Sequence, residues 1–121
     1  MAEPGPDHPI AVTENPHRIR VVLGGVIVAE TTRALTLSEA RFPPVHYIPR
    51  EDAQMDLFDP TRHRTHCPYK GDASYFTVTA GGLVRENAAW SYEAPLPAVA
   101  GIQGRLAFYP SRVDAIEEFT D

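Results

Sequence analysis

The segment at residues 66–71, His-Cys-Pro-Tyr-Lys-Gly, contains the only cysteine and the only lysine of the chain. His66 directly precedes Cys67, and Lys70 follows it by three residues. Nearby cations raise the thiolate fraction of a cysteine, and the thiolate is the reactive form. Cys67 is therefore a candidate catalytic nucleophile or redox centre activated by His66 or Lys70. The alternative is a cysteine that packs as a small hydrophobic residue.

Residues 63–67 also place two imidazoles and a thiol close together in the sequence. A zinc site needs about four ligands of compatible geometry. Here the fourth ligand would have to be Asp59 or a more distant carboxylate, and the spacing matches no zinc-binding pattern. We therefore expect no metal site and no other cofactor, and interpret the histidines as exposed loop residues.

Aromatic residues are the second group that indicates binding, because all five tyrosines and the single tryptophan lie between positions 47 and 109. Trp90 and Tyr92 are expected to share a strand face with Glu86, with Tyr75 one strand over, and such a wall would suit a small cationic or planar ligand. A β core with tyrosine hydroxyls at its rim is the alternative. The candidate ligand-binding residues are Tyr47, Arg50, Asp52, His66, Lys70, Tyr75, Trp90 and Tyr92.

Length, charge and hydropathy limit the possible classes of protein. The 121 residues are enough for one domain with a single core. A formal charge of −5 without a basic cluster argues against nucleic acid as a partner. One cysteine excludes an internal disulfide. No apolar run approaches the ~20 residues that span a bilayer, and no signal peptide is recognisable, so we expect no membrane partner and a cytoplasmic location. The oligomeric state is not indicated.

These candidate residues must be positioned by short strands, because twelve prolines and eight glycines interrupt the chain. Residues 18–23 and 26–30 are rich in β-branched residues and flank Gly24-Gly25, which predicts a hairpin. Residues 74–78 and 83–92 flank Gly81-Gly82 and predict a second hairpin. Further extended segments are expected at residues 34–37, 45–48 and 106–109.

The other segments are expected to be turns and loops. Pro49 precedes a predicted helical turn at residues 50–53, and a second turn is predicted at 98–102. Residues 55–58 are expected to form a short strand or packed loop, and 59–61 a turn. The tail at 112–119 is expected to be helical, with Val113, Ile116 and Phe119 facing inward. Residues 1–9 are expected to be a flexible segment before a single mostly β domain at 10–121.

Several runs of residues, in the right order, resemble the uncharacterised bacterial family called domain of unknown function 427. They lie at residues 24–29, 44–52, 65–75, 86–92 and 107–109. The resemblance implies a β-tent-like fold of two antiparallel sheets, as in methionine sulfoxide reductase B and the thalidomide-binding domain of cereblon. Many β-tents hold zinc with two cysteine pairs, so this chain would be a zinc-free version. The grooves of those relatives are often lined with aromatics, which would place the aromatic wall near Cys67 and Lys70.

The resemblance does not imply a reaction. The family sometimes carries a nucleotidyltransferase-like label, but the sequence has no phosphate-binding loop of the Gly-x-x-x-x-Gly-Lys type. The leading hypothesis is a small-molecule-binding domain with an aromatic-lined pocket next to Cys67 and Lys70. The alternatives are an enzyme that uses Cys67, and a structural or protein-interaction domain.

Overall fold

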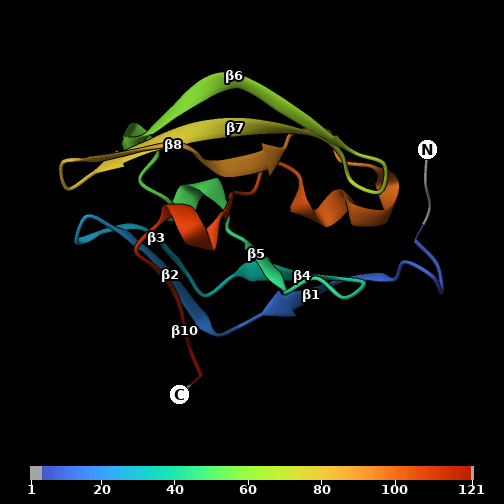
Figure 1. Ribbon diagram of the computed structural model, residues 1–121. Coiled ribbons are helices and arrows are strands. Elements are labelled where there is room, and N and C mark those ends of the chain that lie inside the picture. Colours follow the sequence, from blue (N-terminus) through green and yellow to red (C-terminus); the bar gives the residue numbers. More distant parts are fainter. Residues whose placement is uncertain (1–3, 121) are drawn as a thin grey trace.

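The computed structural model describes residues 4–120, which form three antiparallel sheets joined by short 3-10 turns (Figure 1). The first sheet has the strand order β1 (Ile10–Asn15), β4 (Ala34–Glu39), β5 (Val45–Tyr47). The second has the order β10 (Ala115–Phe119), β2 (Arg18–Leu23), β3 (Val26–Thr31). The third has the order β6 (Phe58–Cys67), β7 (Gly71–Ala80), β8 (Leu83–Tyr92), β9 (Ala107–Phe108). The turns are η1 (Arg50–Asp52), η2 (Met55–Leu57), η3 (Pro97–Ile102) and η4 (Pro110–Arg112).

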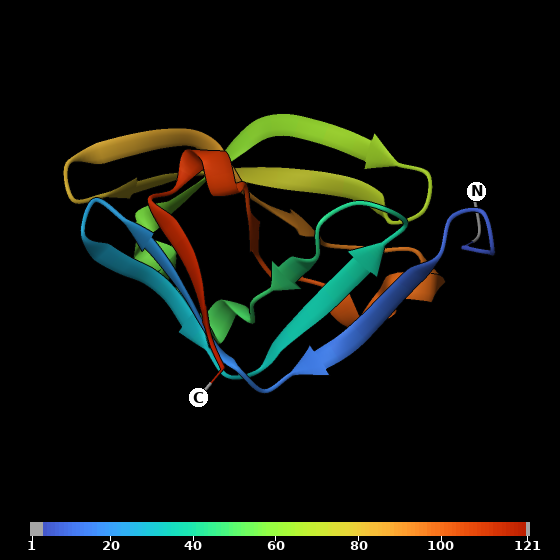
Figure 2. The same cartoon turned by 60° about the horizontal axis from the view of Figure 1, so that its bottom comes forward.

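The prediction of a mostly β fold is confirmed, but the number of sheets is three instead of two. Pro16 and His17 lie between β1 and β2, and the chain passes there from the first sheet to the second, because β1 pairs with β4 and β2 pairs with β3 and β10. In Figure 2 the two three-stranded sheets form a V, and the four-stranded sheet lies across its open side. The space enclosed by the three sheets contains the core and the site described below.

Both expected Gly-Gly hairpins are present, as β2–β3 and β7–β8. The four turn glycines have φ between +57° and +79°, a conformation that residues with a Cβ rarely adopt. The two turns also touch. A Cβ on Gly81 would lie 1.9 Å from the carbonyl oxygen of Gly24, so the turns pack backbone against backbone.

Three of the expected elements are wrong. Residues 59–61 belong to β6, because β6 is an edge strand whose register shifts between Pro60 and Arg64, and such a strand tolerates proline. The tail forms the strand β10, because the free edge of β2 offers it backbone hydrogen-bond partners that a short isolated helix would lack. Residues 55–57 form η2, which is neither a strand nor an irregular loop. The turns predicted at 50–53 and 98–102 are present as η1 and η3.

The buried apolar residues form two clusters. The first cluster packs β2 and β3 against the four-stranded sheet, with Ile19, Val21 and Val78 fully buried. The second packs β4, β5 and η3 against the same sheet and includes Tyr47 and Tyr92. Ile48 and Leu106, both in the first cluster, exchange two backbone hydrogen bonds of 2.8 Å, which tie the end of β5 to the start of β9.

Of the expected flexible segment, residues 1–3 lie outside the described residues, as does residue 121. In the described part, the His8 ring stacks on Tyr69 at 3.8 Å. No helix among residues 4–120 is long and apolar enough to cross a membrane.

Candidate functional site

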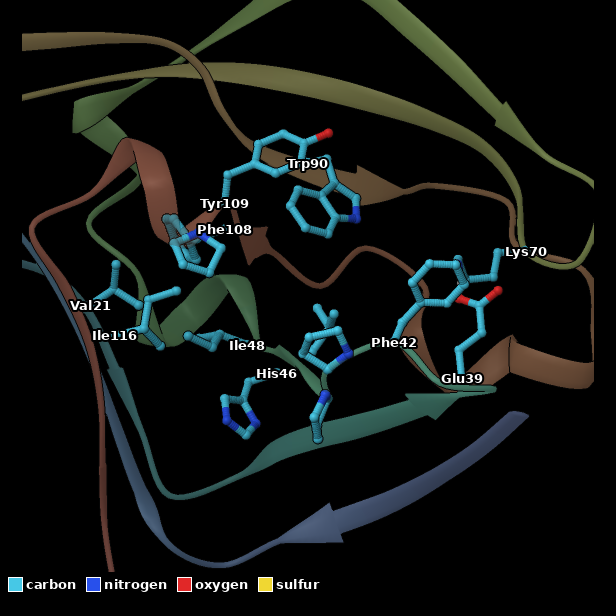
Figure 3. Close-up of a pocket in the computed structure, with 14 residues that line it drawn as sticks. Val21, Glu39, Phe42, His46, Ile48, Lys70, Trp90, Phe108, Tyr109 and Ile116 are labelled. Carbon is cyan, nitrogen blue, oxygen red and sulfur yellow. The ribbon is translucent and has the colours of Figure 1, made fainter. Parts of the chain in front are cut away.

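A cavity of about 650 Å³ lies where the three sheets meet. Val21 and Ile116 line it from the second sheet, while Phe108 on β9 and Ile48 just after β5 complete its apolar end. Figure 3 shows these four residues on one side of the cavity, with Glu39 and Lys70 together at the opposite end. The cavity therefore has one apolar end and one charged end.

The charged end is an ion pair between Glu39 at the end of β4 and Lys70 in the β6–β7 turn, and each side chain is only 12% exposed. Lys70 Nζ donates to Glu39 Oε1, and His8 Nε2 donates to Glu39 Oε2 at 2.7 Å. Burial alone would raise the pKa of the Glu39 carboxyl, but the hydrogen bonds from Lys70 and His8 outweigh it and hold the pKa below its ordinary value. Glu39 is therefore ionised at neutral pH, and both of its oxygens are engaged.

Aromatic rings form the wall between the two ends. Trp90 on β8 and Tyr109 after β9 have ring centroids 4.5 Å apart. The Tyr109 hydroxyl shares a hydrogen bond of 3.1 Å with Tyr75, whose hydroxyl also bonds Thr65 at 2.9 Å. Burial and the hydrogen bond with Tyr75 raise the pKa of Tyr109 to about 12. The wall therefore presents neutral rings with fixed hydroxyl groups at physiological pH.

The cavity continues into a smaller chamber of about 150 Å³ that shares Glu39, Lys70 and Trp90 with it. Tyr47, Tyr75 and Tyr92 line this chamber but not the larger cavity. Burial raises the pKa values of Tyr47 and Tyr92 far above the ordinary tyrosine value. The chamber is thus an aromatic recess directly beside the Lys70 ammonium.

The loop between β4 and β5 forms the lip of the cavity. Its Phe42 lines both chambers, although the residue is 64% exposed. Pro43 and Pro44 follow and restrict the backbone, while Ala40 has a φ of +47° and donates its N–H to the carbonyl of Pro9 at 2.8 Å. A large apolar ring is therefore held at the cavity mouth, where it is too exposed to contribute much to the stability of the fold.

His46 on β5 supplies a second polar group along the cavity (Figure 3). Its Nδ1 shares a hydrogen bond of 2.9 Å with the Thr36 hydroxyl, and its Nε2 lies 3.5 Å from Glu118. Burial lowers the pKa of His46, only partly offset by Glu118. The ring is therefore neutral at neutral pH, which leaves Lys70 and Glu39 as the charged groups that line the cavity among residues 4–120.

The pattern of residues across all three sheets matches a known family model. The model is described as a domain of unknown function, DUF427, and matches residues 11–118, which run from β1 into β10. The chain belongs to the DUF427 family. No curated protein matches the chain.

In this DUF427 domain, five of the residues singled out from the sequence line the two chambers. They are Tyr47, Lys70, Tyr75, Trp90 and Tyr92. Strands β5, β7 and β8 bring four of them together because each of the four lies on the inner side of its strand. The fifth, Lys70, reaches the cavity from the β6–β7 turn.

The other four candidates lie outside this lining, and two of them, Arg50 and Asp52, have charged partners elsewhere. Arg50 pairs with Glu93 and lines a separate hollow of about 550 Å³ with Arg64 and Ser74. Asp52 accepts hydrogen bonds from Thr31 at 2.7 Å and Arg33 at 3.1 Å. Both residues therefore have local partners outside the cavity.

His66 and Cys67 also lie outside the cavity lining. His66 is exposed and pairs with Asp72 at 2.7 Å. Cys67 is half-buried and packs against the second core cluster. Within residues 4–120, no side-chain hydrogen bond joins Cys67 to His66 or Lys70, and no three His, Cys, Asp or Glu side chains gather so as to hold a metal ion.

Among the lining residues that the sequence interpretation missed are Glu39, Phe42, His46 and Tyr109. Phe42 had a local signal, since an aromatic residue between Arg41 and two prolines has no place in a regular strand core. Glu39 had none, because its partner is 31 residues away in the sequence. Only the folded chain brings this pair together.

Proposed function

We propose that this DUF427 domain binds a small organic molecule in the cavity between its three sheets. The observation that carries the proposal is an apolar and aromatic cavity of about 650 Å³ that ends at a single ion pair. Ligand sites are typically cavities of about 300–1,000 Å³ with mostly apolar walls and a few polar groups that orient the ligand. The aromatic wall favours a planar ligand that stacks near Trp90 and Tyr109.

Phe42 supports this function independently. A ring of this size exposed to 64% at a cavity mouth contributes little to the core. A molecule in the cavity would cover this ring and so remove from water the apolar area that folding leaves exposed. Val84, which is 61% exposed at the β8 end of the second hairpin and does not line the cavity, provides a matched comparison.

A fragment screen on the purified protein tests the proposal, with the NMR signal of the Trp90 indole N–H as the readout. This signal is unique because the chain has one tryptophan. Planar fragments are expected to shift it, and Phe42→Ala is expected to weaken their binding about tenfold through lost apolar contact. Val84→Ala should bind as the wild type does. The proposal fails if no fragment shifts the signal, or if the two variants bind equally well.

A further inference from the structure

The charged end of the cavity indicates which head group a ligand would carry. Lys70 has three N–H donors, and within residues 4–120 its ammonium has one hydrogen-bond partner, Glu39. The side chain is only 12% exposed, so the other donors have limited access to water. Donors in such a place are stabilised by an acceptor that enters the cavity.

Glu39 is less suited to receive a ligand. Its Oε1 accepts from Lys70 and its Oε2 accepts from His8, so neither oxygen lacks a donor. A cationic head group would have to displace Lys70 or lie against another positive charge. An anionic oxygen would instead meet an ammonium with donors to spare, and the hydrogen bond would be charge-assisted.

The opposite end of the cavity defines the rest of the ligand. Ile116, with the buried side chains of Val21 and Ile48 behind it, forms an apolar end that lies away from Lys70 and Glu39 in Figure 3, and the Trp90 ring lies between the two ends. A molecule that satisfies both ends has a charged head and an apolar body. The rings of Trp90 and Tyr109 favour a planar body over a flexible chain.

From these observations, and on the basis of the proposed binding function, we infer that the ligand is an amphipathic carboxylate. Its planar apolar body lies beside Trp90, and its carboxylate accepts hydrogen bonds from Lys70. Glu39 and His8 act as positioning residues, because they fix the Lys70 side chain at the cavity end without touching the ligand.

Three probes that share one ring system separate the head groups: naphthalene-2-carboxylate, the neutral naphthalene-2-carboxamide and the cationic naphthalen-2-ylmethylammonium. Binding is measured by calorimetry and by the Trp90 indole signal. The carboxylate is expected to bind about tenfold more tightly than the amide, as a charge-assisted hydrogen bond implies, and the ammonium more weakly than both. Equal or tighter binding of the amide or the ammonium overturns the inference while leaving the binding function intact. If none of the probes binds, the inference fails, and the fragment screen decides separately whether the binding function also fails.

Variants at the ion pair give a second, independent test. Lys70→Met should abolish the preference for the carboxylate while the amide still binds, and Lys70→Arg should keep the preference. Glu39→Gln removes the competing negative charge and is expected to strengthen carboxylate binding severalfold. Thermal unfolding of each variant verifies that it is folded, and Glu39→Gln remains informative if Lys70→Met does not fold. Glu39→Gln keeps an oxygen that can accept from Lys70, so the ammonium stays in place, and weaker carboxylate binding by this folded variant would contradict the inference.

Discussion

Lys70 donates to Glu39 across 31 residues of sequence and joins the β6–β7 turn to the end of β4. This pair explains how the only lysine of the chain is used: its compact ammonium lies in a nearly buried position beside a carboxylate and aromatic rings. An arginine would bring a larger planar group and more donors into the same space. The pair thus has both a structural and a proposed binding role.

The structural role predicts a particular pH dependence. The pKa of Glu39 is lowered in the folded state, so its contribution to stability is complete above the ordinary value of 4.5 and is lost as the pH falls through the lowered value. Glu39→Gln should therefore be less stable than the wild type at neutral pH, and this difference should shrink in acid. Urea unfolding at several pH values measures it. Asp72→Asn is the control, because the Asp72 side chain is 81% exposed. Its free energy of unfolding should stay within about 0.5 kcal/mol of the wild-type value. A stability difference that stays constant across the pH range would contradict the lowered pKa of Glu39.

The contact between the two hairpin turns predicts a contrast between neighbouring glycines. Gly81 and Gly82 both have positive φ, so alanine at either position costs about 1–2 kcal/mol of strain. A Cβ on Gly82 meets nothing within 4 Å, whereas one on Gly81 would overlap the Gly24 carbonyl. Gly81→Ala should therefore lose a further ~1–3 kcal/mol from overpacking. Urea unfolding of the two variants decides this, and equal losses would show that the turns separate at little cost.

The buried tyrosines predict instability in alkali. Burial raises the pKa values of Tyr47, Tyr92 and Tyr109 in the folded state above the ordinary value of 10. As the pH rises above 10, the unfolded chain loses protons that the folded chain retains, so the free energy of unfolding falls. Tyr109→Phe should make this fall less steep by removing one of the three groups. Unfolding curves combined with tyrosinate absorbance measure the effect, and an unchanged slope would show that Tyr109 ionises equally in both states.

Cys67 is predicted to be unnecessary for binding. It packs against the second core cluster and does not line the cavity, so Cys67→Ser should bind the carboxylate probe with wild-type affinity. Iodoacetamide should modify the folded protein more slowly than it modifies free cysteine, because the thiol is half-buried. Rapid alkylation, together with loss of binding in Cys67→Ser, would favour the enzyme hypothesis instead.

The sequence could predict the parts of the fold that local rules determine. Gly24-Gly25 and Gly81-Gly82 mark the hairpins because positive φ is a local requirement. The helix expected in the tail is wrong because the partner of β10 is the free edge of β2, 93 to 101 residues earlier in the chain, and no local pattern reveals that edge. Three sheets were likewise not foreseeable, since the separation of β1 from β2 depends on which edges pair.

The residues of the candidate site could likewise be predicted only where local rules determine their positions. Trp90 and Tyr92 can be grouped from the sequence because strand alternation places them on one face, whereas Tyr47 joins them only through the family resemblance. The charges of Arg50 and Asp52 predict polar contacts but not their partners, because a charged side chain pairs with whichever group the fold brings near it, here Glu93 and Arg33. Long-range ion pairs depend on the packed fold, so their members could not be assigned from spacing.

A crystal structure of the protein with naphthalene-2-carboxylate tests the central claim most directly. The account predicts the ring in the cavity beside Trp90 and Phe42, with a carboxylate oxygen within hydrogen-bond distance of Lys70 Nζ. The separate hollow beside Arg50 and Arg64 is the natural competing site for an anion. A probe bound only there, or a cavity that stays empty while the probe binds in solution, would contradict the claim that the space between the three sheets is the ligand site.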